Sequence, residues 1–310
     1  MKKLIIAAAL AAIAAPLPGV AAPSSTPVVE TEAEVRMDHI SIVKLGRGSP
    51  VILIPGLASP RAVWDGIAPK LAESHSVYLV QVNGFAGDDP GSNLKAGILD
   101  GVVSDLAAYM GRQKIGKAAV IGHSMGGLAG LMFAKAHPDK VERLMIVDSL
   151  PFFAVLLARG GEEPTAASIE PVARMMRDQV AARYGKPVGA EAAASDVARL
   201  ALKPESRTRM AAWAAAADPR VTAQALYEDL TTDLRPSLAA IKTPLTVVVP
   251  WSATAFGREG TLAFYARQYS GSPNVEFIDV AESGHFVMLD QPGSFGSAVD
   301  SFLNGASRSR

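Results

Sequence analysis

The stretch with the clearest capacity for chemistry is Gly122-His123-Ser124-Met125-Gly126. The apolar run Ala118–Ile121 before it predicts a buried strand, and the residues from Leu128 onward predict a helix. Gly-x-Ser-x-Gly between a strand and a helix is typical of a nucleophile elbow, a tight turn that presents the serine hydroxyl above the sheet edge. The alternative is a glycine-rich turn with an incidental serine. The strand and helix context favours Ser124 as a nucleophile.

A serine hydroxyl needs a base within hydrogen-bond reach, and His285 is the best candidate among the five histidines. It lies in the loop Ser283-Gly284-His285-Phe286, directly after the apolar strand pattern of residues 275–280. The other four occupy an edge segment, the start of a strand, the elbow itself and a helix end: His39, His75, His123 and His137. We therefore predict that His285 deprotonates the serine.

A third residue, a carboxylate, normally orients such an imidazole. Asp148 ends the strand pattern of residues 143–147, and a carboxylate at that strand end could reach the outer nitrogen of His285. Glu259, after the strand pattern of residues 245–249, is the alternative, and a site without an acid is a further one. Asp148 could also cap the turn that follows it. We predict Asp148 as the acid.

The elements that must position these residues alternate between strands and helices. Strand patterns occur at residues 35–45, 50–54, 76–82, 118–121, 143–147, 245–249 and 275–280, and helical patterns at 61–72, 93–111, 128–134, 260–269 and 292–303. This alternation predicts an α/β fold with a mostly parallel sheet that is covered on both faces. Ligands in such sheets bind at the carboxyl ends of the strands, where Gly56, Ser124 and Asp148 all fall.

The pattern changes from Pro151 to about Pro236, where strand-like runs vanish and helix-forming residues dominate. We predict four helices here, at Pro171–Tyr184, Ala190–Leu202, Arg207–Ala217 and Val221–Leu230. Because this segment interrupts the succession of sheet strands, we expect it to cover the strand ends as a lid.

The order and spacing of four stretches resemble the α/β-hydrolase superfamily over residues 35–303. These are Ile54-Pro55-Gly56-Leu57, the loop Asn83-Gly84-Phe85-Ala86-Gly87, the elbow, and the loop around His285. The resemblance implies a mostly parallel eight-stranded sheet with a helical cap inserted after strand six. The domains would then be a core of residues 35–150 and 237–304 and a cap of residues 151–236.

The resemblance also bears on the site. It implies that the main-chain N–H groups of Leu57 and Met125 form the oxyanion hole, which stabilises the negative oxygen of a tetrahedral intermediate. In most of the family the acid follows strand seven, which here falls near Ala253, a residue without a carboxylate. Some members instead place the acid after strand six, where this chain has Asp148.

The composition bears on compartment and partners. The 310 residues contain no cysteine, and 30 basic residues balance 30 acidic ones, which gives no indication of nucleic-acid binding. Met1-Lys2-Lys3, the apolar run Leu4–Ala15 and a small-residue site near Ala22 predict a signal peptide over residues 1–22. The run is too short for a comfortable membrane span. We expect a flexible lead at 23–34, no stable span after cleavage, and a periplasmic or secreted protein.

Together these observations predict a secreted serine hydrolase that cleaves a small or medium carboxylic ester through an acyl-enzyme on Ser124. No metal or phosphate motif is legible, so we expect no cofactor. Peptidase, thioesterase and carbon–carbon bond hydrolase activities remain open with the same residues, as does a non-catalytic binding protein. Epoxide hydrolase and haloalkane dehalogenase chemistries are disfavoured, since members of the superfamily with those activities use Asp where this chain has Ser.

Overall fold

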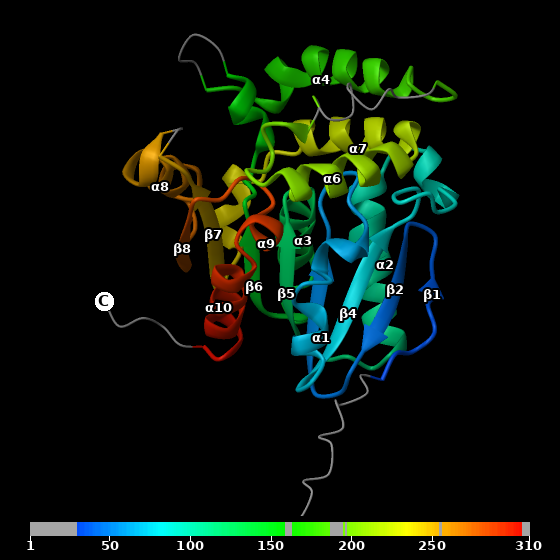
Figure 1. Ribbon diagram of the computed structural model, residues 1–310, viewed down its shortest axis with the longest axis vertical. Coiled ribbons are helices and arrows are strands. Elements are labelled where there is room, and N and C mark those ends of the chain that lie inside the picture. Colours follow the sequence, from blue (N-terminus) through cyan, green and yellow to red (C-terminus); the bar gives the residue numbers. More distant parts are fainter. Residues whose placement is uncertain (1–29, 159–162, 187–194, 196, 254–255, 306–310) are drawn as a thin grey trace, which may run out of the picture.

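One eight-stranded sheet forms the centre of the computed structural model, which describes residues 30–158, 163–186, 195, 197–253 and 256–305. The strand order is β1-β2-β4-β3-β5-β6-β7-β8. Strand β2 runs antiparallel to β1 and β4, and the remaining pairs are parallel. The strands are β1 (Val35–Arg36), β2 (Ile40–Leu45), β3 (Ser49–Ile54), β4 (His75–Val82), β5 (Ala118–His123), β6 (Val141–Val147), β7 (Leu245–Trp251) and β8 (Val275–Ala281). The predicted sheet is confirmed (Figure 1).

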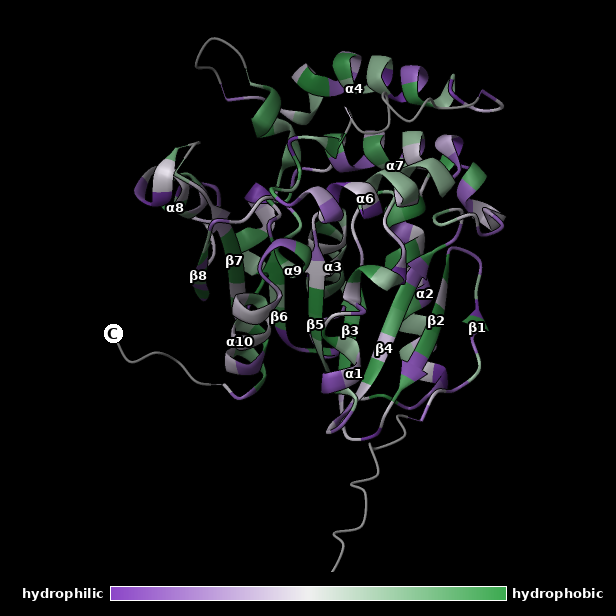
Figure 2. Ribbon diagram, in the orientation of Figure 1, coloured by the Kyte–Doolittle hydropathy of each residue, from purple (hydrophilic) through white to green (hydrophobic). Residues whose placement is uncertain are grey.

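Helices cover both faces of this sheet because its central strands are apolar on both sides. In β3, Ile52 and Ile54 pack into one apolar cluster, whereas Val51 and Leu53 pack into the other. Figure 2 shows the central strands as the most hydrophobic part of the molecule. The first cluster includes helices α2 (Ile98–Arg112), α3 (Met125–Ala136) and α8 (Gly257–Gln268). The second includes η1 (Arg61–Trp64), α1 (Ala68–Leu71), α9 (Val287–Asp290) and α10 (Pro292–Leu303).

Two predicted helices are divided in the structure. The pattern over 61–72 forms η1 and then α1, because Pro69 lacks an N–H and suits the first turn of a new helix. The pattern over 93–111 forms η2 (Gly91–Leu94) and then α2. The first segment ends at Leu94, and Gly97 is the N-cap of α2, with a φ of 95° that glycine adopts without strain.

The cap lies between β6 and β7, where the resemblance implied it. Its elements are η3 (Phe153–Leu157), α4 (Ala166–Ala181), α6 (Pro204–Ala216), α7 (Pro219–Thr231) and η4 (Arg235–Ala240). Helix α4 starts earlier than predicted because Thr165 and Ser168 form a reciprocal capping box. The predicted helix at Ala190–Leu202 lies partly outside the described residues, and in the described part residues 198–200 form a turn and 201–202 are not helical. Figure 1 shows α4 outermost, above α7, which lies over the strand ends.

Helix α7 is joined to the core by hydrogen bonds near both of its ends. At its start, the main-chain N–H of Asp218 donates to the Gly84 carbonyl at 2.7 Å. Near its end, the Glu228 carboxylate accepts from the N–H groups of Gly97 and Leu99 at 2.7 and 2.9 Å, at the positive N-terminus of α2. Helix α4 packs on α7 through the small apolar cluster Phe152, Ala154, Ile169, Ala173 and Leu230.

Candidate active site

Ser124 occupies the turn between β5 and α3. Its φ of 54° and ψ of −126° are strained for a residue with a side chain. The surroundings explain the two glycines of the motif, because a Cβ at Gly122 would lie 2.2 Å from the Gly126 carbonyl oxygen, and one at Gly126 would lie 2.3 Å from that of Ile54. The Ser124 N–H donates to the Val147 carbonyl of β6 at 3.0 Å. The predicted strand-to-helix turn is therefore present.

His285 and Asp148 are directly hydrogen-bonded. The distance between His285 Nδ1 and Asp148 Oδ2 is 2.7 Å, and both side chains are mostly buried. Asp148 follows β6 with φ of 45°, and its N–H donates to the Val248 carbonyl of β7 at 3.0 Å. Since Asp148 can only accept when ionised, Nδ1 carries the proton and Nε2 is left free to act as a base.

The serine and the imidazole lie at the same edge of the sheet. His123, next to Ser124, has its ring centroid 4.6 Å from that of His285. Within the described part of the chain, the Ser124 hydroxyl forms no hydrogen bond. The hydrogen bond between a catalytic nucleophile and its base is often long in the free enzyme and tightens when substrate binds.

The alternative acid, Glu259, lies on the exposed first turn of α8. No hydrogen bond or ion pair joins Glu259 to His285 among the described residues. Asp279 on β8 is also engaged elsewhere, since it accepts from Trp251 Nε1 at 2.9 Å and from the Arg258 guanidinium. The geometry therefore favours Asp148 over Glu259 as the partner of the imidazole.

His123 holds the main chain of the His285 loop. Its fully buried ring places Nε2 3.0 Å from the His285 carbonyl oxygen, so Nε2 carries the proton and donates. Burial, aided by the charge of His285, holds the pKa of His123 well below its ordinary value. A neutral ring at this position keeps a second positive charge away from the site.

The two main-chain N–H groups predicted to bind an oxyanion lie in segments that border the serine. Met125 opens α3 directly after Ser124, and Leu57 follows Gly56 after β3. A Cβ at Gly56 would lie only 3.0 Å from the Ser124 Cβ, so this loop passes directly beside the serine. Neither N–H donates a hydrogen bond within the described residues. Both are thus available to an oxyanion.

Three further residues support the site and were not predicted from the sequence. The Tyr265 hydroxyl donates to Asp148 Oδ1, and burial together with the Asp148 charge raises the pKa of Tyr265 well above its ordinary value. The Tyr269 hydroxyl donates to the Ser149 carbonyl at 2.9 Å. Tyr265 lies in α8 and Tyr269 caps its C-terminus, four residues later; this helical spacing was the signal in the sequence that both could face the same side.

The third supporting residue, Asp290, joins the His285 loop to the cap. Its fully buried carboxylate accepts from the Gly284 N–H at 2.9 Å. It also accepts from the N–H groups of Leu202 and Lys203 at 2.8 and 3.2 Å. Three main-chain N–H groups, two of them from the cap, are thereby fixed around one buried carboxylate, and nothing in the local sequence pattern indicated it.

A cavity of about 1040 Å³ lies between the cap and the catalytic edge of the sheet. Its lining includes Leu57, in the loop after β3, and Phe286, which directly follows His285. Apolar cap side chains provide most of the remaining wall, among them Met176, Met210, Trp213 and Leu226. This cavity is large enough for a ligand of small-molecule size.

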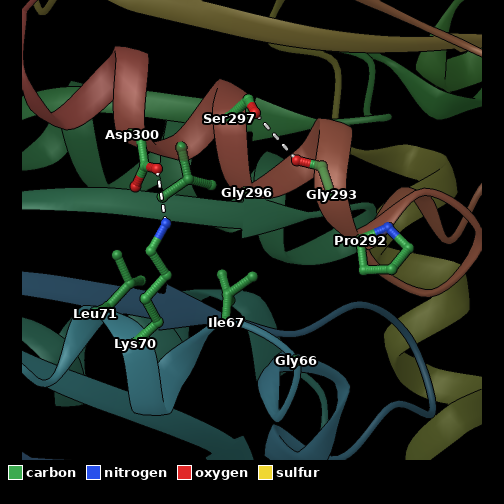
Figure 3. A pocket seen from close by; sticks show the side chains of 10 residues that line it. Gly66, Ile67, Lys70, Leu71, Pro292, Gly293, Gly296, Ser297 and Asp300 are labelled. Carbon is green, nitrogen blue, oxygen red and sulfur yellow. Dashed lines mark hydrogen bonds and ion pairs between the residues drawn. The ribbon is translucent and has the colours of Figure 1, made fainter.

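A second, smaller pocket of about 230 Å³ lies between α1 and α10. Figure 3 shows Lys70 and Asp300 pointing toward one another across it, joined at 2.9 Å, and the Ser297 hydroxyl turned toward the Gly293 carbonyl. Ser124, His285 and Asp148 do not line it. This pocket is therefore separate from the catalytic edge.

Two searches of the described residues bear on metals and membranes. No cluster of three or more His, Asp or Glu side chains is suited to hold a metal ion in that part of the chain. No helix in the described ranges combines the length and the apolar character that a membrane crossing requires. The predicted signal peptide, residues 1–22, lies outside the described residues.

The sheet, the elbow and the His–Asp pair define an α/β hydrolase, and comparison with known proteins agrees. Residues 49–292 match the family model described as the alpha/beta hydrolase fold. The chain belongs to this family. Similar solved structures include an esterase from Thermogutta terrifontis, at 22% identity over 88% of this chain and 99% of that one with a TM-score of 0.71. The structure of an enol-lactonase from Burkholderia xenovorans is also similar, at 18% identity over 88% of this chain and 100% of that one, with a TM-score of 0.68.

Curated relatives have more varied activities. A pimeloyl-[acyl-carrier protein] methyl ester esterase of Aeromonas hydrophila is 32% identical over 37% of this chain and 43% of its own length. A soluble epoxide hydrolase of a Corynebacterium species is 30% identical over 41% of this chain and 44% of its own length. Both matches thus span less than half of those relatives. An N-formylmaleamate deformylase of Pseudomonas putida is 23% identical over 84% of this chain and 90% of its own length.

Proposed function

We propose that this protein is a serine hydrolase that cleaves small or medium carboxylic esters. The observation that carries the proposal is the 2.7 Å bond between His285 Nδ1 and Asp148 Oδ2, at the sheet edge that also presents Ser124 on its strained turn. The ester hydrolases among the relatives and the similar structures support the same class. Fold alone would be a weak argument, because this architecture carries many chemistries.

The reaction would proceed in two halves. His285 Nε2 accepts the Ser124 proton as the serine oxygen attacks the ester carbonyl, and the N–H groups of Leu57 and Met125 bind the resulting oxyanion. The imidazolium then gives its proton to the departing alkoxide, which leaves as the alcohol. Water, deprotonated by the same imidazole, attacks the acyl-enzyme and releases the carboxylic acid. Asp148 stabilises the imidazolium in both halves.

A fluorophosphonate probe combined with p-nitrophenyl esters of graded acyl length tests this function. We expect the probe to label Ser124, and we expect both labelling and ester turnover to disappear in Ser124→Ala and His285→Ala. Circular dichroism should show both variants folded. Folded wild-type protein that neither reacts with the probe nor turns over any ester would contradict the proposal and favour a binding protein.

An amide hydrolase is a second candidate, favoured by the N-formylmaleamate deformylase that aligns with 84% of this chain. Serine hydrolases can use one acyl-enzyme route for both bonds, so the two candidates differ in the leaving group. Comparing kcat/KM for matched p-nitrophenyl esters and p-nitroanilides decides between them. A higher value for the anilide would assign the protein to the amidases.

We also propose that the protein is exported to the periplasm or beyond. The basic start and the apolar run Leu4–Ala15 support this location. Cell fractionation followed by N-terminal sequencing of the mature chain tests it, with cleavage expected near Ala22. Recovery of the full-length chain from the cytoplasm alone would contradict it.

A further inference from the structure

Asp229, on helix α7 of the cap, is a buried carboxylate without a partner. The other two fully or nearly buried aspartates of the described residues, Asp105 and Asp290, accept two and three main-chain N–H groups respectively. Asp229 is 5% exposed, yet it accepts no hydrogen bond and forms no ion pair within the described part of the chain. Buried carboxylates are rare unless they are paired, because desolvation penalises the charge.

Asp229 lies on the inner side of α7, the helix that covers the strand ends, and is adjacent on the helix surface to residues that line the large cavity, although Asp229 itself is not part of that lining. It lies three and seven residues after Leu226 and Thr222, spacings that share one face of a helix, and both of those residues line the cavity. The Thr222 hydroxyl oxygen is itself buried there without a partner. With 5% exposure, the Asp229 side chain still has a small accessible part that a bound molecule could contact.

Asp229 also lies close to the catalytic imidazole. Burial raises the pKa of Asp229 to about 7, and the positive charge of a protonated His285 partly opposes that rise. The two side chains are therefore near enough to interact electrostatically, which agrees with the position of α7 over the strand ends that carry His285 and Ser124. The Asp229 carboxylate is thus a hydrogen-bond acceptor without a protein donor, close to a cavity whose wall is largely apolar.

We propose that Asp229 is a specificity-determining residue that accepts a hydrogen bond from a hydroxyl group of the substrate, close to the scissile ester. The inference rests on the proposed esterase function and narrows it to hydroxylated esters. A substrate hydroxyl supplies the donor that the protein does not, whereas an alkyl group would leave the buried carboxylate unsatisfied. The cost of such an unpaired buried group is what allows a site of this kind to discriminate strongly.

Isosteric ester pairs test the proposal on both sides of the ester bond. For the acyl side, p-nitrophenyl 3-hydroxybutanoate is compared with p-nitrophenyl 3-methylbutanoate. For the alcohol side, 2-hydroxyethyl butanoate is compared with propyl butanoate in a pH-stat. In assays at pH 8, where Asp229 is mostly ionised, we expect wild-type kcat/KM to favour the hydroxylated ester by about 10-fold or more in at least one pair, the range of a hydrogen bond to a charged group.

Variants then assign that preference to Asp229. In Asp229→Leu the preference should be lost or reversed, because kcat/KM for the hydroxylated ester falls relative to kcat/KM for the alkyl ester of the same pair. Asp229→Asn keeps the shape of the side chain and an acceptor oxygen, so it should retain part of the preference. If Asp229→Leu does not fold, the asparagine variant still tests the proposal. Asp178→Asn, an exposed cap carboxylate on α4, is the control and should leave the preference unchanged.

Three outcomes would overturn the assignment. The first is the absence of a preference in both wild-type pairs, and the second is a preference that survives in Asp229→Leu. The third is an equal loss of turnover on both esters of a pair in folded Asp229→Leu and Asp229→Asn, which would make the residue structural. No turnover of any ester by the wild type would overturn the esterase function as well, so the two failures are distinguishable.

Discussion

The Nε2 atom of His123 lies 3.0 Å from the main-chain carbonyl oxygen of His285, although 161 residues separate them in the sequence. The residue before the proposed nucleophile therefore holds the backbone of the proposed base. The hydrogen bond between these two residues fixes the distance between elbow and histidine loop independently of the catalytic side chains. It explains why the second residue of the elbow is a buried, neutral ring and not a small filler.

Substitution of the carboxylate partner should separate the two candidate acids. We expect Asp148→Asn to lower kcat for a p-nitrophenyl ester by between about 10²- and 10⁴-fold, because the amide no longer holds the reactive imidazole tautomer or stabilises the imidazolium. The matched control is Glu259→Gln, on the exposed turn of α8, which should retain wild-type turnover. Near-normal kcat in Asp148→Asn with a loss in Glu259→Gln would reverse the assignment.

Removal of the tyrosine hydroxyl beneath the acid should destabilise the fold. Tyr265→Phe leaves Asp148 Oδ1 without its donor in a buried location, which should cost about 1–3 kcal/mol of unfolding free energy. Urea denaturation measures the change. Tyr227→Phe removes a more exposed hydroxyl bond, to Glu170, and should cost less than about 1 kcal/mol. Equal losses of unfolding free energy in the two variants would show that the buried Tyr265 hydrogen bond stabilises the fold no more than the exposed one.

Glycine at position 56 should be required for activity. In Gly56→Ala the new Cβ would lie 2.9 Å from His123 Nδ1 and 3.0 Å from the Ser124 Cβ, so the oxyanion loop or the elbow must shift. Because a misplacement of about 1 Å between reacting groups can cost about 10²-fold in rate, we expect kcat to fall by about that factor. Gly66→Ala, where no atom lies within 4 Å of the new Cβ, is the control, and unchanged kcat in both variants would refute the predicted crowding.

The pH dependence of stability should carry the signature of Asp229. Its pKa of about 7 in the folded protein exceeds its ordinary value of 3.8, so the folded state binds this proton more tightly than the unfolded chain. The stabilisation of the folded state by this proton is fully present below about pH 4 and is lost as the pH rises through 7. Asp229→Asn should therefore become more stable relative to wild type from pH 5 to pH 8, by on the order of 1.4 kcal/mol per pH unit at most.

Thermal and urea denaturation of the two proteins at several pH values within this window provide the measurement. A difference in unfolding free energy that stays constant from pH 5 to pH 8 would show that Asp229 titrates normally. Asp178→Asn again serves as the exposed control and should give no pH-dependent difference.

Local sequence patterns predicted those parts of the fold that local physics determines. Helix α10 has the predicted bounds, Pro292–Leu303, because a proline suits its first turn and its apolar positions keep one helical face. The elbow and the histidine loop followed from short motifs at strand ends. Helix α4 began earlier than predicted because its capping box uses Ser168 where Glu or Gln is the usual signal.

The remaining features depend on contacts that no local pattern contains. Asp148 and Glu259 were both acceptable as acids until the order of β6, β7 and β8 showed which strand end faces His285. No sequence pattern singled out Asp229, because the helical period does not show which face of α7 covers the catalytic edge. Partners such as Asp290 and Leu202 meet only through the tertiary fold.

The two layers of the cap differ in how they are attached. The inner helix, α7, is bound to the core through Asp218 and Glu228, near its two ends, and the latter occupies the N-terminus of α2. The outer helix, α4, rests on α7 through apolar side chains. An evolving or engineered descendant could therefore exchange the outer layer for a new specificity, while any replacement of α7 would have to rebuild the end of a core helix at the same time.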